Sequence, residues 1–135
     1  MQDASDFSGF EVRADAAREG LGVFATKPFK AGECIGFFSG RETNVRSRMS
    51  LQFGENFFVE PGETDPFRNL NHACDPSARF EGRDLFAARA LRPGDAITID
   101  YNAHEDVLSA PFDCRCGAAR CVGTVRGRRA LSETA

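Results

Sequence analysis

The chain contains no tryptophan and a single tyrosine, Tyr101, so its core has to be built from other side chains. Thirteen phenylalanines among the 135 residues supply that material. Apolar runs are short, and none approaches the roughly 20 residues that a membrane-spanning helix needs. The first six residues have neither the basic start nor the apolar stretch of a signal peptide. We therefore expect a soluble intracellular protein, cytoplasmic or nuclear, without a membrane segment.

Lysine is scarce as well, because Lys27 and Lys30 are the only lysines among 17 basic residues. The net charge is −3, yet residues 114–135 carry five arginines and one glutamate. This arginine-rich end is the one feature that suggests a zinc-stabilised nucleic-acid binder. Such a protein needs a basic face with aromatic residues that stack on bases, and a net negative charge does not favour it.

An acidic stretch lies in the middle of the chain, where residues 55–65 contain Glu55, Glu60, Glu63 and Asp65 and no base. Two interpretations stay open. The stretch is either a solvated loop or an acidic wall that faces a basic ligand.

The length predicts one domain, large enough to bury about two-thirds of the surface of the unfolded chain. Short apolar or alternating runs separated by Gly-, Pro- and Asp-containing turns are typical of strands. The predicted strands are residues 10–13, 21–26, 34–38, 56–60, 78–80, 85–90 and 96–101, and the one helix candidate is 44–49. This pattern predicts a compact, mainly β domain.

Residues 24–35 and 86–97 resemble each other: each has the pattern of a strand, a basic turn closed by Gly and an acid, and a second strand. Two copies are too few for a solenoid, which needs about three or more units. We expect one supersecondary unit that is used twice in the domain.

Five cysteines without an export signal fit a reducing compartment. Cys74 has three potential partners with the spacing Cys-x-Cys-x4-Cys, namely Cys114, Cys116 and Cys121. Four thiolates form a tetrahedral, structural zinc site, although a reduced cluster of small apolar side chains has the same sequence pattern. Cys34 lies in an apolar run and is predicted to be a core residue without chemistry.

Four blocks occur in the order of one known family. They are Gly20-Leu21-Gly22-Val23-Phe24-Ala25, Asn71-His72-Ala73-Cys74-Asp75-Pro76, Gly94-Asp95-Ala96-Ile97-Thr98-Ile99-Asp100-Tyr101, and Cys114-Arg115-Cys116-Gly117 followed by Cys121. With these blocks the chain resembles a SET domain, the protein-lysine methyltransferase module, followed by a cysteine-rich post-SET tail. Ser77, Ala73 and Asn69 depart from the family pattern. The stretch from Phe38 to Arg68 is also short, which trims the insert that usually lines the peptide groove.

The resemblance implies a SET-type, β-clip-like fold at 1–110, a post-SET zinc-binding segment at 111–127 in the same structural unit, and a disordered tail at 128–135. It implies two cofactors, S-adenosyl-L-methionine and a structural Zn²⁺ held by Cys74, Cys114, Cys116 and Cys121. Gly20, Leu21 and Gly22 would contact the methionine end of the first, and Asn71 and His72 the adenosine part. Phe112 and Val122 are candidates to pack on the adenine.

Tyr101 is the implied catalytic residue and also touches the cofactor, because in this family the tyrosine sits where the lysine channel meets the methyl group. From the sequence alone, a core tyrosine bonded to a backbone carbonyl is the competing interpretation. Phe80 and Ile99 would form the channel walls, with Phe57 or Phe58 behind. Since Ile99 replaces a frequent Phe or Tyr, we expect that more than one methyl group can be added.

The resemblance therefore implies methylation of a lysine in a basic protein segment, bound as an added strand, and leaves a homodimer open. The main alternative is a SET-like, zinc-stabilised binding module that has lost turnover. A Cys/His hydrolase that uses His72 or His104 is a further alternative, but zinc explains the cysteines better.

Overall fold

The computed structural model describes residues 9–15, 20–47, 49–103, 105, 112–113, 121 and 124–125. Strands dominate this part of the chain, as the sequence predicts, and short 3₁₀ turns are its only helical elements. None of its helices is long and apolar enough to cross a membrane.

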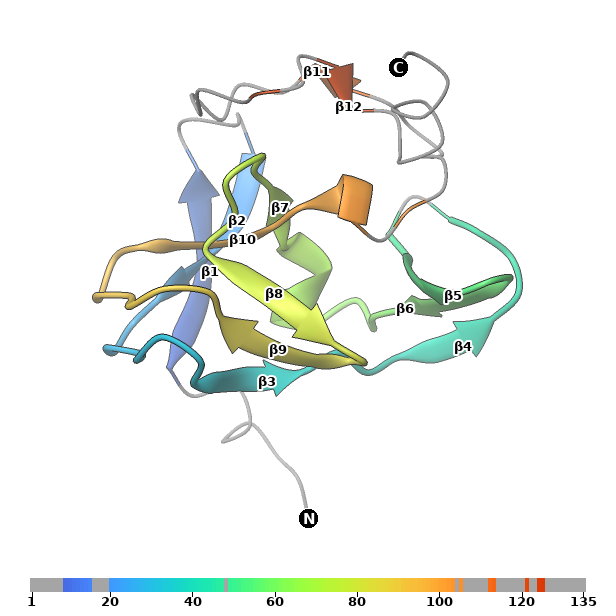
Figure 1. Ribbon diagram of the computed structural model, residues 1–135. Coiled ribbons are helices and arrows are strands. Elements are labelled where there is room, and N and C mark those ends of the chain that lie inside the picture. Colours follow the sequence, from blue (N-terminus) through green and yellow to red (C-terminus); the bar gives the residue numbers. More distant parts are fainter. Residues whose placement is uncertain are drawn as a thin grey trace.

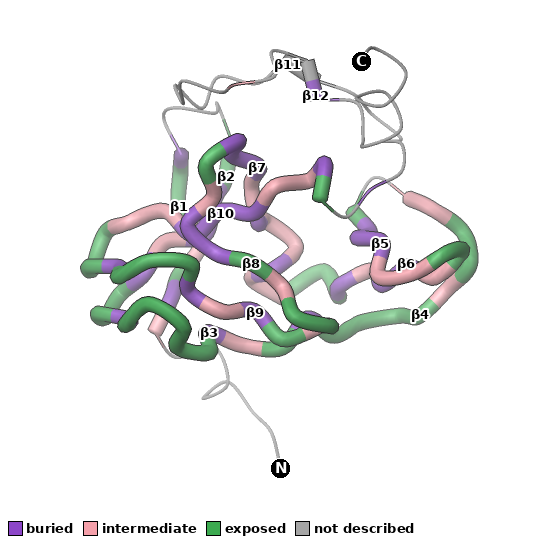
Figure 2. Tube along the Cα trace, viewed as in Figure 1, coloured by how far each residue is buried: buried purple, intermediate pink, exposed green. Residues whose placement is uncertain are grey.

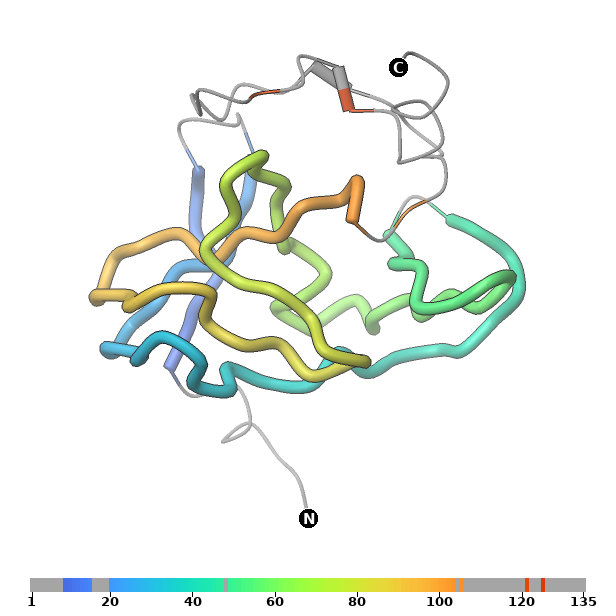
Figure 3. The backbone as a smooth tube through the Cα atoms, in the orientation of Figure 1, coloured from blue at the N-terminus to red at the C-terminus, as the bar shows by residue number. Residues whose placement is uncertain are grey.

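A four-stranded sheet has the order β1-β2-β10-β7 (Figure 1). Its strands are β1 (Phe10–Asp15), β2 (Gly20–Ala25), β10 (Ala96–Ile99) and β7 (Asn71–His72). β1, β2 and β10 pair antiparallel, whereas β7 pairs parallel with β10. Figure 3 follows the chain from the blue β1–β2 hairpin to the orange β10, which returns beside β2.

Two three-stranded antiparallel sheets complete the domain, with the orders β3-β9-β8 and β4-β6-β5. The first contains β3 (Cys34–Phe37), β9 (Asp84–Ala87) and β8 (Ala78–Glu81). The second contains β4 (Arg41–Thr43), β6 (Phe57–Glu60) and β5 (Leu51–Gly54). The 3₁₀ turns η2 (Pro66–Asn69) and η3 (Tyr101–Ala103) flank β7 and β10, and β11 (Phe112–Asp113) pairs with β12 (Thr124–Val125).

The two similar segments 24–35 and 86–97 do form one unit used twice, and the copies pack against each other. Phe29 and Leu91, which are equivalent in the two copies, exchange both backbone hydrogen bonds at 3.0 and 2.9 Å. The flanking bonds are equivalent as well: Gly32 N to Ala87 O at 2.8 Å, and Gly94 N to Ala25 O at 2.7 Å. Phe29 and Leu91 are both buried, so this local two-fold arrangement lies within the core.

Phenylalanines form much of that core, and Phe67 joins its parts. Its ring stacks on Phe10 at a centroid distance of 4.9 Å and lies parallel to Phe38 at 6.4 Å. Phe38 in turn contacts Phe53 and Phe80. Figure 2 shows buried residues along β10 and at the start of β8, whereas the turn between β2 and β3 is exposed apart from Phe29. One η2 residue thus links the first strand to the aromatic side chains beside β8.

Arginines cover phenylalanine rings on the outer strands. The pairs are Arg13 over Phe24 at 4.2 Å, Arg79 over Phe86 at 5.6 Å and Arg83 over Phe37 at 4.8 Å from the ring centroid. Each of these arginines also forms an ion pair with a glutamate, namely Glu11, Glu81 and Glu42 respectively. Guanidinium groups stack well on aromatic faces and bind carboxylates with their other edge, so each arginine shields a partly exposed ring.

Three predictions about the fold are wrong. Residues 44–47 and 49 form bends and turns and not a helix; Val45 N donates to Thr43 Oγ1 and Ser47 N to Ser50 Oγ, and such side-chain bonds compete with helical ones. Cys34 is exposed, because it is the first residue of β3 and the inward position falls to Ile35. The strand predicted to run to Tyr101 ends at Ile99.

Candidate active site

Tyr101 begins η3, and the preceding Asp100 explains why the strand stops there. Asp100 Oδ1 accepts a hydrogen bond from Asn102 N at 2.9 Å, and Asp100 O accepts one from Ala103 N at 3.0 Å. A short aspartate side chain that binds the backbone two residues later stabilises a turn over a strand. The turn leaves Tyr101 only partly buried beside the core.

Two hydrogen bonds fix Tyr101 to the segment around β7. Its backbone N–H donates to His72 Nδ1 at 2.9 Å, and its hydroxyl donates to Leu70 O at 2.6 Å. The carbonyl bond is the one that a structural tyrosine would make. Because the phenolic proton is directed at Leu70, however, Oη offers the rest of its surroundings acceptor lone pairs only. The residue is held rigidly and can accept weak donors.

Asn71 joins β7 to the glycine block. Its Nδ2 donates to Leu21 O at 2.9 Å and to Asp15 Oδ2 at 3.3 Å. These two acceptors fix the orientation of the amide and leave Oδ1 as its acceptor. A Cβ on Gly22 would lie only 2.9 Å from Asn71 Nδ2, so this glycine is required by a close approach to the protein's own side chain. Gly20 and Leu21 are exposed beside it.

His72 is buried, and its two ring nitrogens contact different groups. Nδ1 accepts from Tyr101 N, and Nε2 lies 3.3 Å from Cys74 Sγ. An Nδ1 that accepts a hydrogen bond carries no proton, so the neutral ring holds its proton on Nε2, facing the sulfur. An Nε2–H cannot take a proton from a thiol. With Cys74 itself only 5% exposed, this geometry argues against a Cys/His hydrolase.

The structure separates the predicted channel residues. Phe57 and Phe80 are partly buried at the edge of the core, whereas Phe58 is 3% exposed and Ile99 is fully buried. Phe57 and Phe58 are neighbours on β6 and point to opposite faces, and Arg46 covers the Phe58 ring. Phe53, which was not among the predicted site residues, has its ring centroid 5.2 Å from that of Phe80. The alternation of Leu51 and Phe53 was the available signal.

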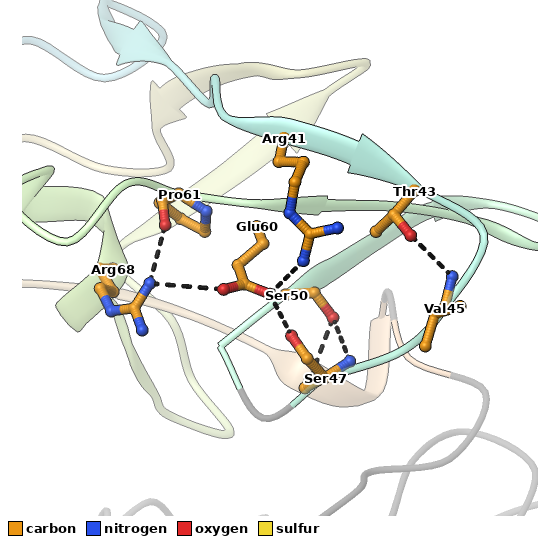
Figure 4. A network of polar contacts seen from close by, with 8 residues as sticks. All are labelled: Arg41, Thr43, Val45, Ser47, Ser50, Glu60, Pro61 and Arg68. Carbon is orange, nitrogen blue, oxygen red and sulfur yellow. Dashed lines mark hydrogen bonds and ion pairs between the residues drawn. The ribbon is translucent and has the colours of Figure 1, made fainter.

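The acidic stretch is not a continuous wall. Glu60 binds Arg41, Arg68 and Ser47 (Figure 4), and the Ser47 hydroxyl, followed by the two arginines, lowers its pKa. Asp65 caps η2 by accepting from Phe67 N at 2.9 Å, and burial raises its pKa despite that bond. Only Glu55 and Glu63 point to solvent.

Several predicted site residues fall outside the described part of the chain: Cys114, Cys116, Val122 and His104. For Phe112 the structure describes only the backbone, which pairs with Val125 in the β11–β12 ladder. This ladder brings together the two ends of the segment that contains Cys114, Cys116 and Cys121. Within the described residues no group of three potential metal ligands occurs.

Ser77, where the SET pattern usually has Asn, is bonded to β10. Its N–H donates to Thr98 Oγ1, and its hydroxyl accepts from Thr98 N, both at 3.0 Å. The loop after Cys74 is thus anchored to the strand that leads to Tyr101, so the departure leaves the arrangement of the blocks intact.

Comparison with known proteins agrees with this arrangement. Residues 20–102 match the SET domain family. The chain is 30% identical to an H3 lysine-36 specific histone-lysine N-methyltransferase of Yarrowia lipolytica and 32% identical to an H3 lysine-4 specific one of Cryptococcus neoformans var. neoformans. Each alignment covers 82% of this chain but only 17% and 9% of the relatives, so the chain spans less than a fifth of their length.

Solved structures show the same fold. The crystal structure of KRYPTONITE in complex with mCHG DNA and SAH is 26% identical, with a TM-score of 0.68, over 85% of this chain and 28% of that one. The methyltransferase domain of human SETMAR is 19% identical, with a TM-score of 0.69, over 87% and 58% of the two chains. Because the family model matches residues 20–102, more than half of the 135-residue chain, the chain belongs to the SET domain family.

Proposed function

We propose that this chain is an S-adenosylmethionine-dependent protein-lysine N-methyltransferase that acts on a lysine in a basic protein segment. The observation that carries the proposal is the attachment of the only tyrosine to the Asn71–His72 strand, beside the glycine block. The histone-lysine methyltransferase relatives support the reaction class. The SAH in the KRYPTONITE structure supports the choice of cofactor.

The residues beside β7 fit such a cofactor. Asn71 Oδ1 is left to accept a hydrogen bond beside the exposed Gly20 and Leu21, and the buried Gly22 lets the Asn71 side chain approach this backbone closely. The α-ammonium of a methionine moiety is a donor of the kind that such an oxygen binds. We assign the methionine end to Gly20, Leu21 and Gly22, and the adenosine part to Asn71 and the His72 backbone. Phe112 and Val122 remain the candidates for the adenine face.

S-adenosylmethionine supplies, when bound, an electrophilic sulfonium methyl that a neutral lysine amine can displace in line. Tyr101 then has an orienting role, because its Oη presents lone pairs that can accept weak C–H···O contacts. A free lysine has a pKa near 10.4, and desolvation in an apolar channel favours the neutral amine. Alignment of the reacting groups can contribute several kcal/mol, about 7–11 in the best intramolecular reactions.

Phe57, Phe53 and Phe80 are the better candidates for the channel wall, because each is partly exposed at the edge of the core. Phe58 and Ile99 would act from behind, as packing. With an aliphatic residue at Ile99 there is no hydroxyl to restrain the amine, so we expect products with more than one methyl group. Mass spectrometry of a methylated peptide that finds monomethyl-lysine alone would contradict this.

The substrate is proposed to bind as an added strand, since β4 and β5 are the edges of their sheet. On β5 the Gln52 N–H donates to Glu105 Oε2 at 2.6 Å and so points away from β6. This N–H of β5 is therefore already occupied by the buried Glu105 carboxylate. Glu55 and Glu63 add exposed negative charge that attracts a basic segment. Direct nucleic-acid binding is not part of the proposal, and a homodimer stays open.

We further propose a structural zinc ion on Cys74, Cys114, Cys116 and Cys121, with residues 111–127 as a post-SET segment that folds together with the SET domain at 1–110. The fit rests on Cys74, whose sulfur faces an N–H donor and thus suits a thiolate. Exposed Cys34 offers a matched control. Metal analysis of purified protein should find one zinc per chain in the wild type and in Cys34→Ser, and a loss in Cys74→Ser. Equal zinc content in both variants would refute the assignment.

The decisive experiment is calorimetric titration of S-adenosylmethionine into the zinc-replete chain, followed by methyl transfer to basic peptides. We expect one-to-one binding, with turnover lost in Tyr101→Phe while cofactor affinity persists. Saturable binding without turnover on any lysine peptide would favour the non-catalytic SET-like binding module. No binding by well-folded protein would refute the cofactor site.

A further inference from the structure

His72 is the only histidine in the described part of the chain, and its side chain is completely inaccessible to solvent. It lies between two groups with different proposed roles, Tyr101 on one side and Cys74 on the other. The His72 and Tyr101 rings also lie close, with centroids 5.4 Å apart. The side chain thus bridges the tyrosine and the sulfur.

The tautomer of His72 follows from its neighbours. If Nδ1 carried a proton, it would point at the Tyr101 N–H, which lies 2.9 Å away and is also a donor. Asp100 Oδ1, at 3.5 Å from Nδ1, already accepts from Asn102 N. Nδ1 is therefore the acceptor, and Nε2 carries the proton that faces Cys74 Sγ at 3.3 Å.

The strength of the Cys74 sulfur as a hydrogen-bond acceptor depends on whether it is a neutral thiol or a metal-bound thiolate. A metal-bound thiolate is a stronger hydrogen-bond acceptor than a neutral thiol, and outer-shell donors of this kind orient metal ligands. A stronger Nε2–H···S bond holds the imidazole ring in place. Nδ1 of the same ring accepts the hydrogen bond from the Tyr101 amide. A ring that is held more firmly at Cys74 therefore also holds Tyr101, the first residue of η3, more firmly.

We propose that His72 is a positioning residue that couples metal binding at Cys74 to the placement of Tyr101. The coupling passes through two hydrogen bonds and the parallel pairing of Ile99 with His72. The inference rests on the proposed zinc site and goes beyond it: the metal stabilises the tail and also holds the tyrosine ring.

The composition of the chain makes this testable without an activity assay. Because there is no tryptophan and only one tyrosine, ultraviolet emission excited in the tyrosine band reports on Tyr101 alone. Titrating zinc into the chelator-treated 135-residue chain should change this emission and reach a plateau at one equivalent.

Two substitutions at His72 separate its two bonds. His72→Asn keeps an acceptor near the position of Nδ1 but does not reach Cys74, whereas His72→Gln can place an amide donor near the position of Nε2. In His72→Asn we expect zinc to bind about 10-fold more weakly, as when other outer-shell partners are lost. The Tyr101 emission change should disappear even at saturating zinc. Compared with His72→Asn, His72→Gln should restore the zinc affinity more fully than the zinc-induced change in Tyr101 emission. The control Cys34→Ser should match the wild type in both measurements.

The outcomes are distinguishable. A zinc-induced emission change in His72→Asn equal to that of the wild type would overturn the coupling and leave the zinc site standing. Failure of the wild type to bind one equivalent of zinc would overturn both. If the His72 variants do not fold, NMR of the wild type loaded with spin-active cadmium decides: we expect scalar coupling between the metal and the His72 Nε2 proton. Its absence would refute the bridge.

Discussion

Gly22→Ala offers the sharpest test of how the proposed cofactor site is built. The added methyl group would lie 2.9 Å from Asn71 Nδ2 and 3.1 Å from Asp15 Oδ2, whereas ordinary contacts of a Cβ begin at 3.4 Å. The Asn71 amide therefore has to retreat by about 0.5 Å, which stretches its 2.9 Å bond to Leu21 O. Overpacking of this kind costs about 1–3 kcal/mol.

The cost should appear in both stability and binding. For a domain of this length each kcal/mol lowers Tm by about 4 °C, so we expect a fall of about 4–12 °C in circular dichroism melts. If the displaced amide cannot return when the cofactor binds, calorimetry should show an S-adenosylhomocysteine affinity lower by about 5- to 140-fold, since each 1.4 kcal/mol is one factor of ten.

Gly62→Ala is the matched control. A Cβ at Gly62 meets nothing within 4 Å, and its φ is not in the left-handed region, so neither Tm nor affinity should fall. If Gly22→Ala behaves like Gly62→Ala in both measurements, the close approach of Asn71 to the glycine block is not what orders this site, and the reasoning fails.

The remaining predictions concern stability. The Ser47 hydroxyl is the main cause of the lowered pKa of Glu60. The ionised Glu60 therefore stabilises the folded protein above pH 4.5, and this stabilisation is lost as the pH falls through the folded pKa. Glu60→Gln should make Tm depend less steeply on pH in the acid range. The raised pKa of Asp65 has the opposite effect on stability. Burial disfavours the ionised carboxylate, so folding stability falls as the pH rises from 3.8 through the folded pKa. Asp65→Asn, which keeps a capping oxygen, should thus leave Tm at pH 7 unchanged or higher. A lower Tm would contradict this. Leu91→Ala at the contact of the two repeats should cost about 2–5 kcal/mol in urea unfolding. Exposed Val45→Ala should cost little, and equal effects would refute the importance of that contact.

The sequence predicted those strands that have a recognisable local pattern of apolar residues. Residues 21–26 form a short, mostly apolar run and residues 96–101 alternate between apolar and polar positions, and β2 and β10 occur there. β7 could not be predicted in this way. Asn71 and His72 are polar, and they form a strand only because β10 pairs with them in parallel, which is a tertiary interaction.

For the candidate site, the four SET-like sequence blocks indicated the candidate residues but not the hydrogen bonds between them. The structure bonds Tyr101 to His72 and Asn71 to Leu21, and the roles that the SET pattern implies for these residues stay predictions. The sequence pattern did not predict that Gly22 makes room for Asn71 or that His72 bridges to Cys74. For Tyr101 it suggested a backbone carbonyl as one alternative, but it did not identify Leu70 O as the acceptor. Each of these depends on distances between side chains that are far apart in the chain.

The arginines that cover the outer phenylalanines have a consequence for any lysine-directed chemistry. A guanidinium shields a ring and binds a glutamate as well as an ammonium does, yet it is not an amine acceptor for a lysine methyltransferase. Because arginine occupies these places, Lys27 and Lys30 are the only side-chain amines in the chain, and both lie in the turn between β2 and β3. Lys27→Arg combined with Lys30→Arg would give a variant free of lysine, in which the proposed methyl transfer can be assayed. Any methyl label that such a protein incorporated into lysine would then have to lie on the substrate.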